Sequence, residues 1–330
     1  MRHILLTGLL GLFCIQLFAT TIYVKANGTG TGTSWSNAAG DLAAVLLNAQ
    51  PGDQVWVARG TYYPTKDRNR SICFTVPTGV KVFGGFAGNE SSTQQRNIQS
   101  NKTILSGNIG SKSDPKDNSF TVIFFKNANA NNQLDGFTIA DGNANGAGPS
   151  GDKERCGGGL YLKGSKDKNA QPIIQSCVFQ NNFARDGGAV YVNGRRGECS
   201  PVFSNCKFLH NSANLDGGAI FNDGRHDGKA NPSFTNCTFT GNKGNYGGAI
   251  CNYGGQGESS PKIYSCTFTN NEAFLRGGAI FNMDIDGETK PIVNDCQFVD
   301  NKAVAGKGMY TFSKYKEKQE GSVNSVAKMN

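Results

Sequence analysis

The sequence is short of hydrophobic residues and has no long apolar run after its N-terminal segment. Hydrophobic residues make up 37% of the 330 residues, too few to fill the thick core of a compact domain. After residue 18 no run reaches the roughly 18 apolar residues that a membrane-spanning helix needs. The composition therefore favours a fold with a thin core and predicts no transmembrane segment after signal cleavage.

A strong charge bias is also absent. The formal net charge is +8, and acidic and basic residues are interspersed along the chain. This mild excess does not indicate a nucleic-acid partner, although it is compatible with an acidic polysaccharide.

The first residues have the order typical of a secretory signal peptide. Arg2 and His3 give a positive tip, an apolar run follows over residues 4–18, and small residues come next at Ala19, Thr20 and Thr21. Such a run is too short to span a bilayer. We predict a signal peptide over residues 1–21 and a secreted product.

Glycine is abundant, and it is arranged in a repeat of 30 residues. Gly accounts for 44 residues, and each repeat unit passes from a Gly-Gly block through a Pro to a Cys-x-Phe-x-x-Asn block. The Gly-Gly blocks begin at Gly157, Gly187, Gly217, Gly247 and Gly277, the prolines are Pro172, Pro201, Pro232, Pro261 and Pro291, and the last blocks begin at Cys177, Cys206, Cys237, Cys266 and Cys296. Repeats of this length are typical of solenoids, so residues 157–306 are predicted to form five coils.

Each unit contains three short segments in which apolar and polar residues alternate, which predicts strands rather than helices. Three strands joined by turns close one coil, so we predict an all-β, single-domain, right-handed parallel β-helix. The paired glycines are expected at a sharp turn with positive φ, where a bulky side chain would collide with the next coil.

Stacked coils place equivalent residues on top of one another, so repeated side chains should form columns. The expected columns are an inward stack of Phe179, Phe208, Phe239, Phe268 and Phe298, an asparagine ladder of Asn182, Asn211, Asn242, Asn271 and Asn301, and a shorter ladder of Asn222, Asn252 and Asn282. The five repeat cysteines are expected to be buried thiols, because parallel Cβ vectors suit neither a disulfide nor a tetrahedral metal. Pairing among Cys73, Cys156 and Cys199 stays open.

Residues 22–156 are predicted to form a cap and less regular coils, and residues 307–330 a polar tail. A short amphipathic helix is expected around residues 42–49, behind the possible N-caps Ser34 and Ser36, as a lid over the first coil. Strands are expected at residues 55–58, 74–76, 80–83, 120–125 and 134–139, and a surface loop at residues 141–152.

The repeat resembles that of the polymorphic outer-membrane protein family, in which Gly-Gly-Ala-Ile is paired with Phe-x-x-Asn, as at residues 217–220 and 239–242 here. The opening IYVKANGTGTGTSW and the segment PGDQVWVARGTYYP look like those of large secreted β-helix proteins of Gram-negative bacteria. The resemblance implies a pectate-lyase-like fold, a secreted or outer-membrane location and a role in adhesion.

Two carboxylates are candidates for a metal site. Asp186 and Asp216 each precede a Gly-Gly pair and should lie one coil apart. Stacked carboxylates repel unless they bind a cation or hydrogen-bond the turn, so a calcium site is one hypothesis and turn capping is the other.

The loops between the Gly-Gly strand and the Pro segment are the other candidate. They are expected to project from one edge of the rod and to form a continuous ridge of polar side chains. The candidate ligand-binding residues on it are Arg195, Arg196, Asp223, Arg225, His226, Asp227 and Tyr253. His226, between Arg225 and Asp227, could also be a general base.

The favoured hypothesis is a non-catalytic adhesin that binds an extracellular glycan or a surface protein through the loop ridge. One alternative is an enzyme, either a calcium-dependent polysaccharide lyase or a glycoside hydrolase, acting on an acidic polysaccharide. Another is a purely structural passenger fragment. The sequence indicates no cofactor besides the hypothetical calcium, and it identifies no catalytic residue.

Overall fold

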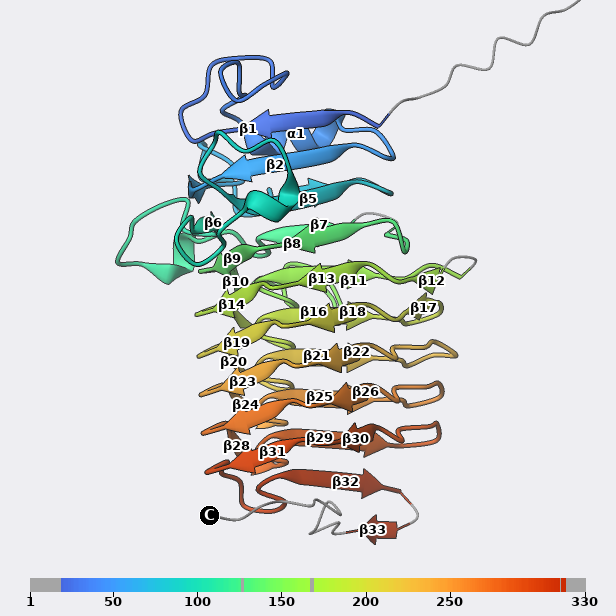
Figure 1. The fold of residues 1–330 in the computed structure, drawn as a ribbon. Helices are drawn as coiled ribbons and strands as arrows, with labels where there is room; N and C mark the ends of the chain where they lie inside the picture. Colours follow the sequence, from blue (N-terminus) through green and yellow to red (C-terminus); the bar gives the residue numbers. More distant parts are fainter. Residues whose placement is uncertain (1–18, 126–127, 167–168, 315, 319–330) are drawn as a thin grey trace, which may run out of the picture.

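The chain forms one rod of stacked β-coils, with a helix at its N-terminal end (Figure 1). The computed structural model describes residues 19–125, 128–166, 169–314 and 316–318, so most of the predicted signal peptide lies outside the described residues. Within them the strands of successive coils pair in parallel, apart from one antiparallel pair at the C-terminal end. The predicted all-β parallel β-helix is confirmed.

Four sheets and one smaller strand pair run along the described part of the rod, and we name the sheets A to D. Sheet A contains β1 (Thr21–Val24), β2 (Gln54–Ala58), β5 (Lys81–Phe86), β8 (Gln133–Asp135), β13 (Ile173–Gln175), β18 (Val202–Ser204), β22 (Ser233–Thr235), β26 (Lys262–Tyr264) and β30 (Ile292–Asn294). Sheet B contains β3 (Gly60–Tyr62), β6 (Thr103–Ser106), β9 (Phe137–Ala140), β14 (Val178–Gln180), β19 (Lys207–Leu209), β23 (Thr238–Thr240), β27 (Thr267–Thr269) and β31 (Gln297–Val299).

Sheet C carries the Gly-Gly blocks, and sheet D is a short fourth sheet that the sequence analysis did not predict. Sheet C contains β4 (Phe74–Val76), β7 (Ile123–Phe125), β11 (Leu160–Lys163), β16 (Val190–Asn193), β21 (Ile220–Asp223), β25 (Ile250–Tyr253), β29 (Ile280–Asp284), β32 (Met309–Ser313) and β33 (Lys316–Lys318). Sheet D contains β10 (Asn143–Ala144), β15 (Phe183–Ala184), β20 (Ser212–Ala213), β24 (Lys243–Tyr246) and β28 (Glu272–Arg276). The remaining elements are the pair β12 (Asn169–Ala170) and β17 (Glu198–Cys199), the helix α1 (Leu42–Asn48), and the 3-10 turns at Thr93–Gln95 and Pro115–Asp117.

The coils turn at residues that tolerate a left-handed backbone. Asn205, Asn270 and Gly187 have φ values of 54°, 53° and 63°, a region that Gly and Asn enter at low cost. A Cβ atom added to Gly188 would lie 2.3 Å from the carbonyl oxygen of Gly218 in the next coil. The expected Gly-Gly turn is therefore confirmed, both for the positive φ and for the close approach of the next coil.

The interior contains the predicted columns. The ring centroids along the Phe179–Phe298 stack lie 4.6 to 5.1 Å apart with nearly parallel planes. The five repeat thiols are buried, and each donates to backbone carbonyl oxygens. Burial raises the pKa of Cys177 to about 12, so the interior thiol stays uncharged.

Both asparagine ladders are also confirmed. Along the long ladder each Nδ2 donates to the Oδ1 of the next coil over 2.9 to 3.0 Å. In the short ladder Asn222 and Asn252 make the same kind of bond, over 2.7 and 2.8 Å. These side chains are buried, so the ladders satisfy polar groups inside the rod, except for Oδ1 of Asn222 at the start of the short ladder, which has no hydrogen-bond partner among the described residues.

The N-terminal coils differ in detail from the sequence-based expectations. The helix begins at Leu42, and its N-cap is Asp41, whose side chain accepts from the backbone N–H of Ala44. The expected N-caps Ser34 and Ser36 lie in an earlier turn, where their hydroxyls contact each other. The expected strand at residues 134–139 is split between sheets A and B at Gly136, whose φ is 82°.

Two segments expected to lack secondary structure contain strands. The loop expected at residues 141–152 contains β10, whose two residues are buried beneath the surrounding turns. The segment expected as a polar tail contains β32 and β33, because Tyr310 continues an outward column of sheet C after Phe281.

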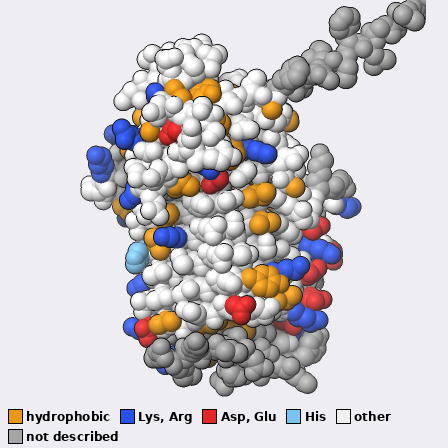
Figure 2. Space-filling model, viewed as in Figure 1, with side chains coloured by type: hydrophobic (Ala, Val, Ile, Leu, Met, Phe, Trp, Pro, Cys, Tyr) orange, Lys and Arg blue, Asp and Glu red, His pale blue; other side chains and the backbone are white. Residues whose placement is uncertain are grey.

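The expected ridge of loops runs down one edge of the rod, on the side where Figure 1 labels β12 and β17. Glu198, Lys229, Glu258 and Glu288 lie in register along it. Figure 2 shows acidic and basic side chains alternating down this edge. Among the described residues, no helix has the length and apolarity required to cross a membrane.

Candidate functional site

Three columns of side chains face outward from sheet C. The middle column consists of Phe124, Tyr161, Tyr191, Phe221, Cys251, Phe281 and Tyr310. On one side of it lie Cys156, Asp186, Asp216, Tyr246 and Arg276, and on the other lie Asn193, Asp223, Tyr253 and Met283. This outer face carries both sets of polar residues that the sequence analysis selected.

The middle column is buried, apart from the half-buried Phe124, although it faces away from the core. The hydroxyl of Tyr161 donates to the carbonyl oxygen of Gly151 (2.6 Å), and Nη1 of Arg195 donates to that of Ser150 (2.8 Å). The loop that contains Ser150 and Gly151 therefore lies against this part of the face, and Tyr191 is 0% exposed. Burial and the charge of Asp223 raise the pKa of Tyr191, so its hydroxyl stays protonated and donates.

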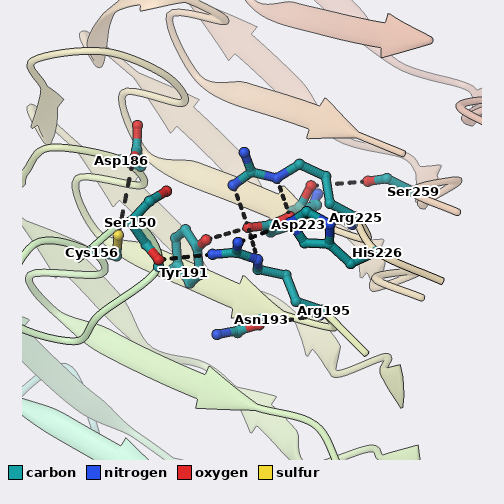
Figure 3. A network of polar contacts seen from close by, with 12 residues as sticks. Ser150, Cys156, Asp186, Tyr191, Asn193, Arg195, Asp223, Arg225, His226 and Ser259 are labelled. Carbon is teal, nitrogen blue, oxygen red and sulfur yellow. Dashed lines mark hydrogen bonds and ion pairs between the residues drawn. The ribbon is translucent and has the colours of Figure 1, made fainter. Parts of the chain in front are cut away.

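Asp223, at the end of β21, is the centre of the polar network in Figure 3. Its carboxylate accepts a hydrogen bond from the Tyr191 hydroxyl. It also accepts hydrogen bonds from Nε of Arg225 (2.7 Å) and from Nη2 of Arg225 (2.6 Å). Nε of Arg195 lies 3.8 Å from the same carboxylate. The expectation that Asp223 projects from the ridge is wrong, because its outward position on the strand lies beneath these arginines and is 0% exposed.

Arg225 is held on three sides. Burial alone would lower its pKa, but the hydrogen bonds and charge of Asp223 raise the pKa above its ordinary value, so the guanidinium stays charged. Its Cζ lies 4.6 Å from the ring centroid of Tyr253 and 5.8 Å from that of Phe221, distances typical of cation–π contacts. Arg225 therefore covers the aromatic column and keeps a fixed orientation.

His226 contacts the second arginine. Nη2 of Arg195 lies 3.0 Å from Nε2 of His226, and because a guanidinium only donates, the imidazole nitrogen must accept. This contact requires a neutral His226 with its proton on Nδ1. The general-base hypothesis for His226 stays a prediction, and any such role would have to displace Arg195 from this nitrogen.

Asp186 and Asp216 lie one coil apart at the Gly-Gly turns, as predicted. Nη1 of Arg185 is 3.6 Å from the Asp186 carboxylate. Burial raises the pKa of both carboxyl groups, and the charge of Asp186 further raises that of Asp216, to about 7. Asp216 can therefore gain or lose a proton near neutral pH.

The turn carboxylates and Arg225 influence one another electrostatically. The positive charge of Arg225 acts on Asp186 and on Asp216 across the aromatic column. The negative charge of Asp223 acts on Asp186 in the opposite sense. The structure thus places the turn carboxylates and the arginines close enough to influence each other's protonation.

Two of the predicted ligand-binding residues lie on the ridge itself. Arg196 and Asp227 are exposed, and both have a left-handed backbone at the loop tips. Asp227 lines a shallow open depression with Lys229, Gln256, Glu258 and Asp286. Arg196 and Asp227 are thus solvent-facing neighbours of the network rather than members of it.

The middle column, which includes Tyr161, Tyr191 and Cys251, was not predicted from the sequence. A signal was present, because the fifth position of the blocks GGGLYL, GGAVYV, GGAIFN and GGAICN is aromatic except for that cysteine. Cys156 and Cys251 belong to this outer cluster, whereas Cys199 belongs to the interior cluster. Cys156 and Cys199 therefore lie on opposite sides of the coil wall, and the structure has both as free thiols.

Comparison with known proteins adds a family. Residues 155–324, just over half of the chain, match the family described as right handed beta helix region. The chain belongs to the right-handed β-helix family. None of the curated protein sequences compared with it matches.

Among solved structures, this β-helix is similar to that of pectate lyase Pel9A. The TM-score is 0.46 at 13% identity, over 89% of this chain and 74% of that chain. It is also similar to the structure of a rhamnogalacturonan lyase, with a TM-score of 0.45 at 13% identity over 82% and 74% of the two chains. The likeness concerns the fold alone.

The predicted calcium site of this β-helix fits the ion poorly. Calcium takes about six to eight oxygen ligands, but the described residues contain no group of three or more His, Cys, Asp or Glu side chains that could hold a metal. Arg185 and Arg225 also place positive charge beside Asp186 and Asp216. The calcium hypothesis stays a prediction, to be tested by metal titration.

Proposed function

We propose that the protein binds an acidic glycan on the outer face of sheet C, at the arginine cluster formed by Arg195 and Arg225 over Asp223. The observation that carries the proposal is that two guanidinium groups share one buried carboxylate. Their side chains are 23% and 21% exposed, against 0% for Asp223. Arg195 and Arg225 carry two positive charges and Asp223 one negative charge, so these three groups together have a net charge of +1.

A uronic-acid carboxylate is the ligand whose chemistry suits this cluster. Guanidinium groups bind carboxylates through paired, charge-assisted hydrogen bonds. Arg195 and Arg225 are already oriented by Asp223, Ser150 and Tyr253, so little side-chain entropy is lost when a ligand binds. The ridge beside the cluster would then contact neighbouring sugars through Arg196 and Asp227.

We infer an extracellular setting for this activity. The positive tip and apolar run of the first residues support secretion, and the Gly-Gly-Ala-Ile repeat supports a place on the outer-membrane surface of a Gram-negative bacterium. The partner would then be an extracellular glycan or a glycan-bearing surface protein, and the protein would act as an adhesin.

Arg195 and its neighbour Arg196 provide a matched test. Polygalacturonate would be titrated into wild type, Arg195→Gln and Arg196→Gln by isothermal calorimetry at low salt. We expect Arg195→Gln to weaken binding about tenfold or more, and Arg196→Gln to change it by less than about threefold. Equal effects of the two substitutions, or no binding by wild type, would refute the proposal.

Cleavage of the same glycan is a second candidate function, and Asp216 favours it. A carboxyl group with a pKa of about 7 is suited to proton transfer near neutral pH. The test incubates wild type and Asp216→Asn with polygalacturonate and follows both unsaturated product by ultraviolet absorbance and new reducing ends. Product that needs Asp216 would establish an enzyme, whereas binding without product would leave the adhesin proposal standing.

A further inference from the structure

A second concave surface lies at the N-terminal end of the rod, lined by residues 26–28, 40–42 and 61–67; this end, with β1 and α1, is at the top of Figure 1. It is a cleft of about 640 Å³ between the capping segment and the loop that follows β3. Its lining includes Asn27, Asp41, Thr61, Tyr63, Lys66 and Asp67. This volume is within the range of small-molecule sites, about 300–1,000 Å³.

The walls of this N-terminal cleft are held by local hydrogen bonds. On the capping side the backbone N–H of Lys25 donates to Ala39 and that of Gly28 to Lys25, both over 2.9 Å. A Cβ atom on Gly40 would lie 2.0 Å from the carbonyl oxygen of Gly28, so the two backbone segments are in direct contact. The capping wall is therefore formed before any ligand arrives.

The opposite wall is equally constrained. The Tyr62 hydroxyl donates to the carbonyl oxygen of Ala58 (2.9 Å), which anchors the end of β3. Beyond it, the Asp67 carboxylate accepts from the Thr65 hydroxyl (2.5 Å) and from the backbone N–H of Asn69 (3.0 Å). These bonds fix the loop on both sides of Lys66.

The side chains of the cleft suit a neutral sugar better than an acidic one. Tyr63 is an aromatic residue that is 45% exposed, and an aromatic ring packs well against the apolar C–H face of a pyranose. Around it are one amide, hydroxyl groups, two carboxylates and one ammonium group. The ionised groups sum to one negative charge, which disfavours a uronic acid, while the polar atoms offer donors and acceptors for sugar hydroxyls.

A neighbouring cleft extends this surface. It has a volume of about 450 Å³ and is lined by Thr29, Thr31, Ala44 and Asn48, among others. The two clefts share Gly28, Gly40 and Asp41, so they meet along the tightly packed glycine contact. The two recesses therefore flank one tight backbone contact at this end of the rod.

We propose that the N-terminal cleft is a binding site for a neutral oligosaccharide, with Tyr63 as its stacking platform. The site is separate from the arginine cluster and does not depend on the function proposed for that cluster. A chain with both sites would recognise two kinds of sugar at two positions along one rod.

The experiment titrates the full chain with cello-, xylo-, manno- and malto-oligosaccharides, monitored by saturation-transfer NMR and calorimetry. We expect at least one of them to bind, Tyr63→Ala to weaken that binding about tenfold, and Tyr63→Phe to retain it, because the phenylalanine ring keeps the stacking face. Phe274→Ala is the matched control, since Phe274 is an exposed aromatic (74%) outside the cleft, and it should bind as wild type does.

Thr61→Trp is a second variant, which tests whether Tyr63→Ala acts on the cleft itself or indirectly through the fold. Thr61 is exposed and lines the cleft, so Thr61→Trp should obstruct it and weaken binding with the fold intact. Arg195→Gln should bind the neutral sugar normally, which separates this proposal from that for the arginine cluster. The proposal is overturned if none of these oligosaccharides binds, or if Tyr63→Ala and Thr61→Trp both bind like wild type.

Discussion

The interior asparagine ladder and the outer carboxylates differ in how their buried polar atoms obtain hydrogen-bond partners. Both are columns of polar side chains that coil stacking removes from water. In the ladder, Asn242 accepts from Asn211 through Oδ1 and donates from Nδ2 to Asn271 and to the carbonyl oxygen of Phe208. An amide carries a donor and an acceptor, so a column of identical amides satisfies itself.

A column of carboxylates cannot do this, because an ionised carboxylate only accepts. Asp186 and Asp216 occupy equivalent positions; burial raises the pKa of both, and the charge of Asp186 raises that of Asp216 further. Asp223 has different neighbours: Asn193 and Tyr253 lie in register with it, and arginines balance its charge. Repetition therefore stabilises neutral polar columns, whereas buried charge requires partners that do not repeat.

The largest expected effect comes from placing a charge inside the ladder. Asn242→Asp removes two donated hydrogen bonds and buries a carboxylate against the Asn271 oxygen, so we expect a loss of about 3–5 kcal/mol in unfolding free energy. Urea unfolding followed by circular dichroism measures it. Asn236→Asp, at an exposed turn, is the control and should cost less than about 0.5 kcal/mol; equal costs would contradict the comparison.

A smaller loss is expected when the outer charge is removed from its partners. Asp223→Asn leaves the arginines and the Tyr191 hydroxyl without a carboxylate, at a cost of about 2–3 kcal/mol. Asp227→Asn, in the same loop but exposed, should leave the urea midpoint nearly unchanged. A double-mutant cycle with Arg225→Gln should show coupling above about 1 kcal/mol, and additive effects would mean that the pair is not linked.

Removal of one stacked carboxylate should stabilise the protein, with a defined pH dependence. The pKa of Asp216 is about 7 in the folded chain against an ordinary 3.8. Between these values the folded chain keeps a proton that the unfolded chain has released, so stability falls as pH rises through that window.

Asp216→Asn abolishes this loss, so the variant should exceed wild type by about 1–2 kcal/mol at pH 8 and by little at pH 4. Unfolding midpoints at the two pH values measure the difference. An equal gain in unfolding free energy at pH 4 and pH 8 would show that ionisation of Asp216 does not destabilise the folded chain.

The smallest change in unfolding free energy is expected from an exposed ion pair. Lys243 and Glu272 form a 3.2 Å ion pair between neighbouring coils, but their side chains are 67% and 50% exposed. Glu272→Gln should therefore change the unfolding free energy by less than about 0.5 kcal/mol. A larger loss would mean that stacking strengthens surface pairs as well as buried amides.

Much of the interior could be predicted from the sequence because its contacts join equivalent residues. A Phe and an Asn recur at the positions of Phe239 and Asn242 in each unit. Parallel register therefore stacks each of them on the equivalent residue of the next coil. The same reasoning failed at Gly136, where a single glycine divides one alternating run between two sheets. Sheet D was also not predicted, because its strands lack a strong repeated motif.

The outer face was decided only by tertiary structure. The sequence selected Asp186, Asp216, Arg225 and His226, but it could not show that they share one surface or that Asp223 is buried beneath it. Those facts depend on which coil each residue occupies and on the path of the loop at Ser150, which no repeat specifies. The sequence by itself determined the columns, because like side chains satisfy one another in register. The site needed the fold, because only the stacking of coils brings Arg195 to Asp223 and the loop at Ser150 to Arg195.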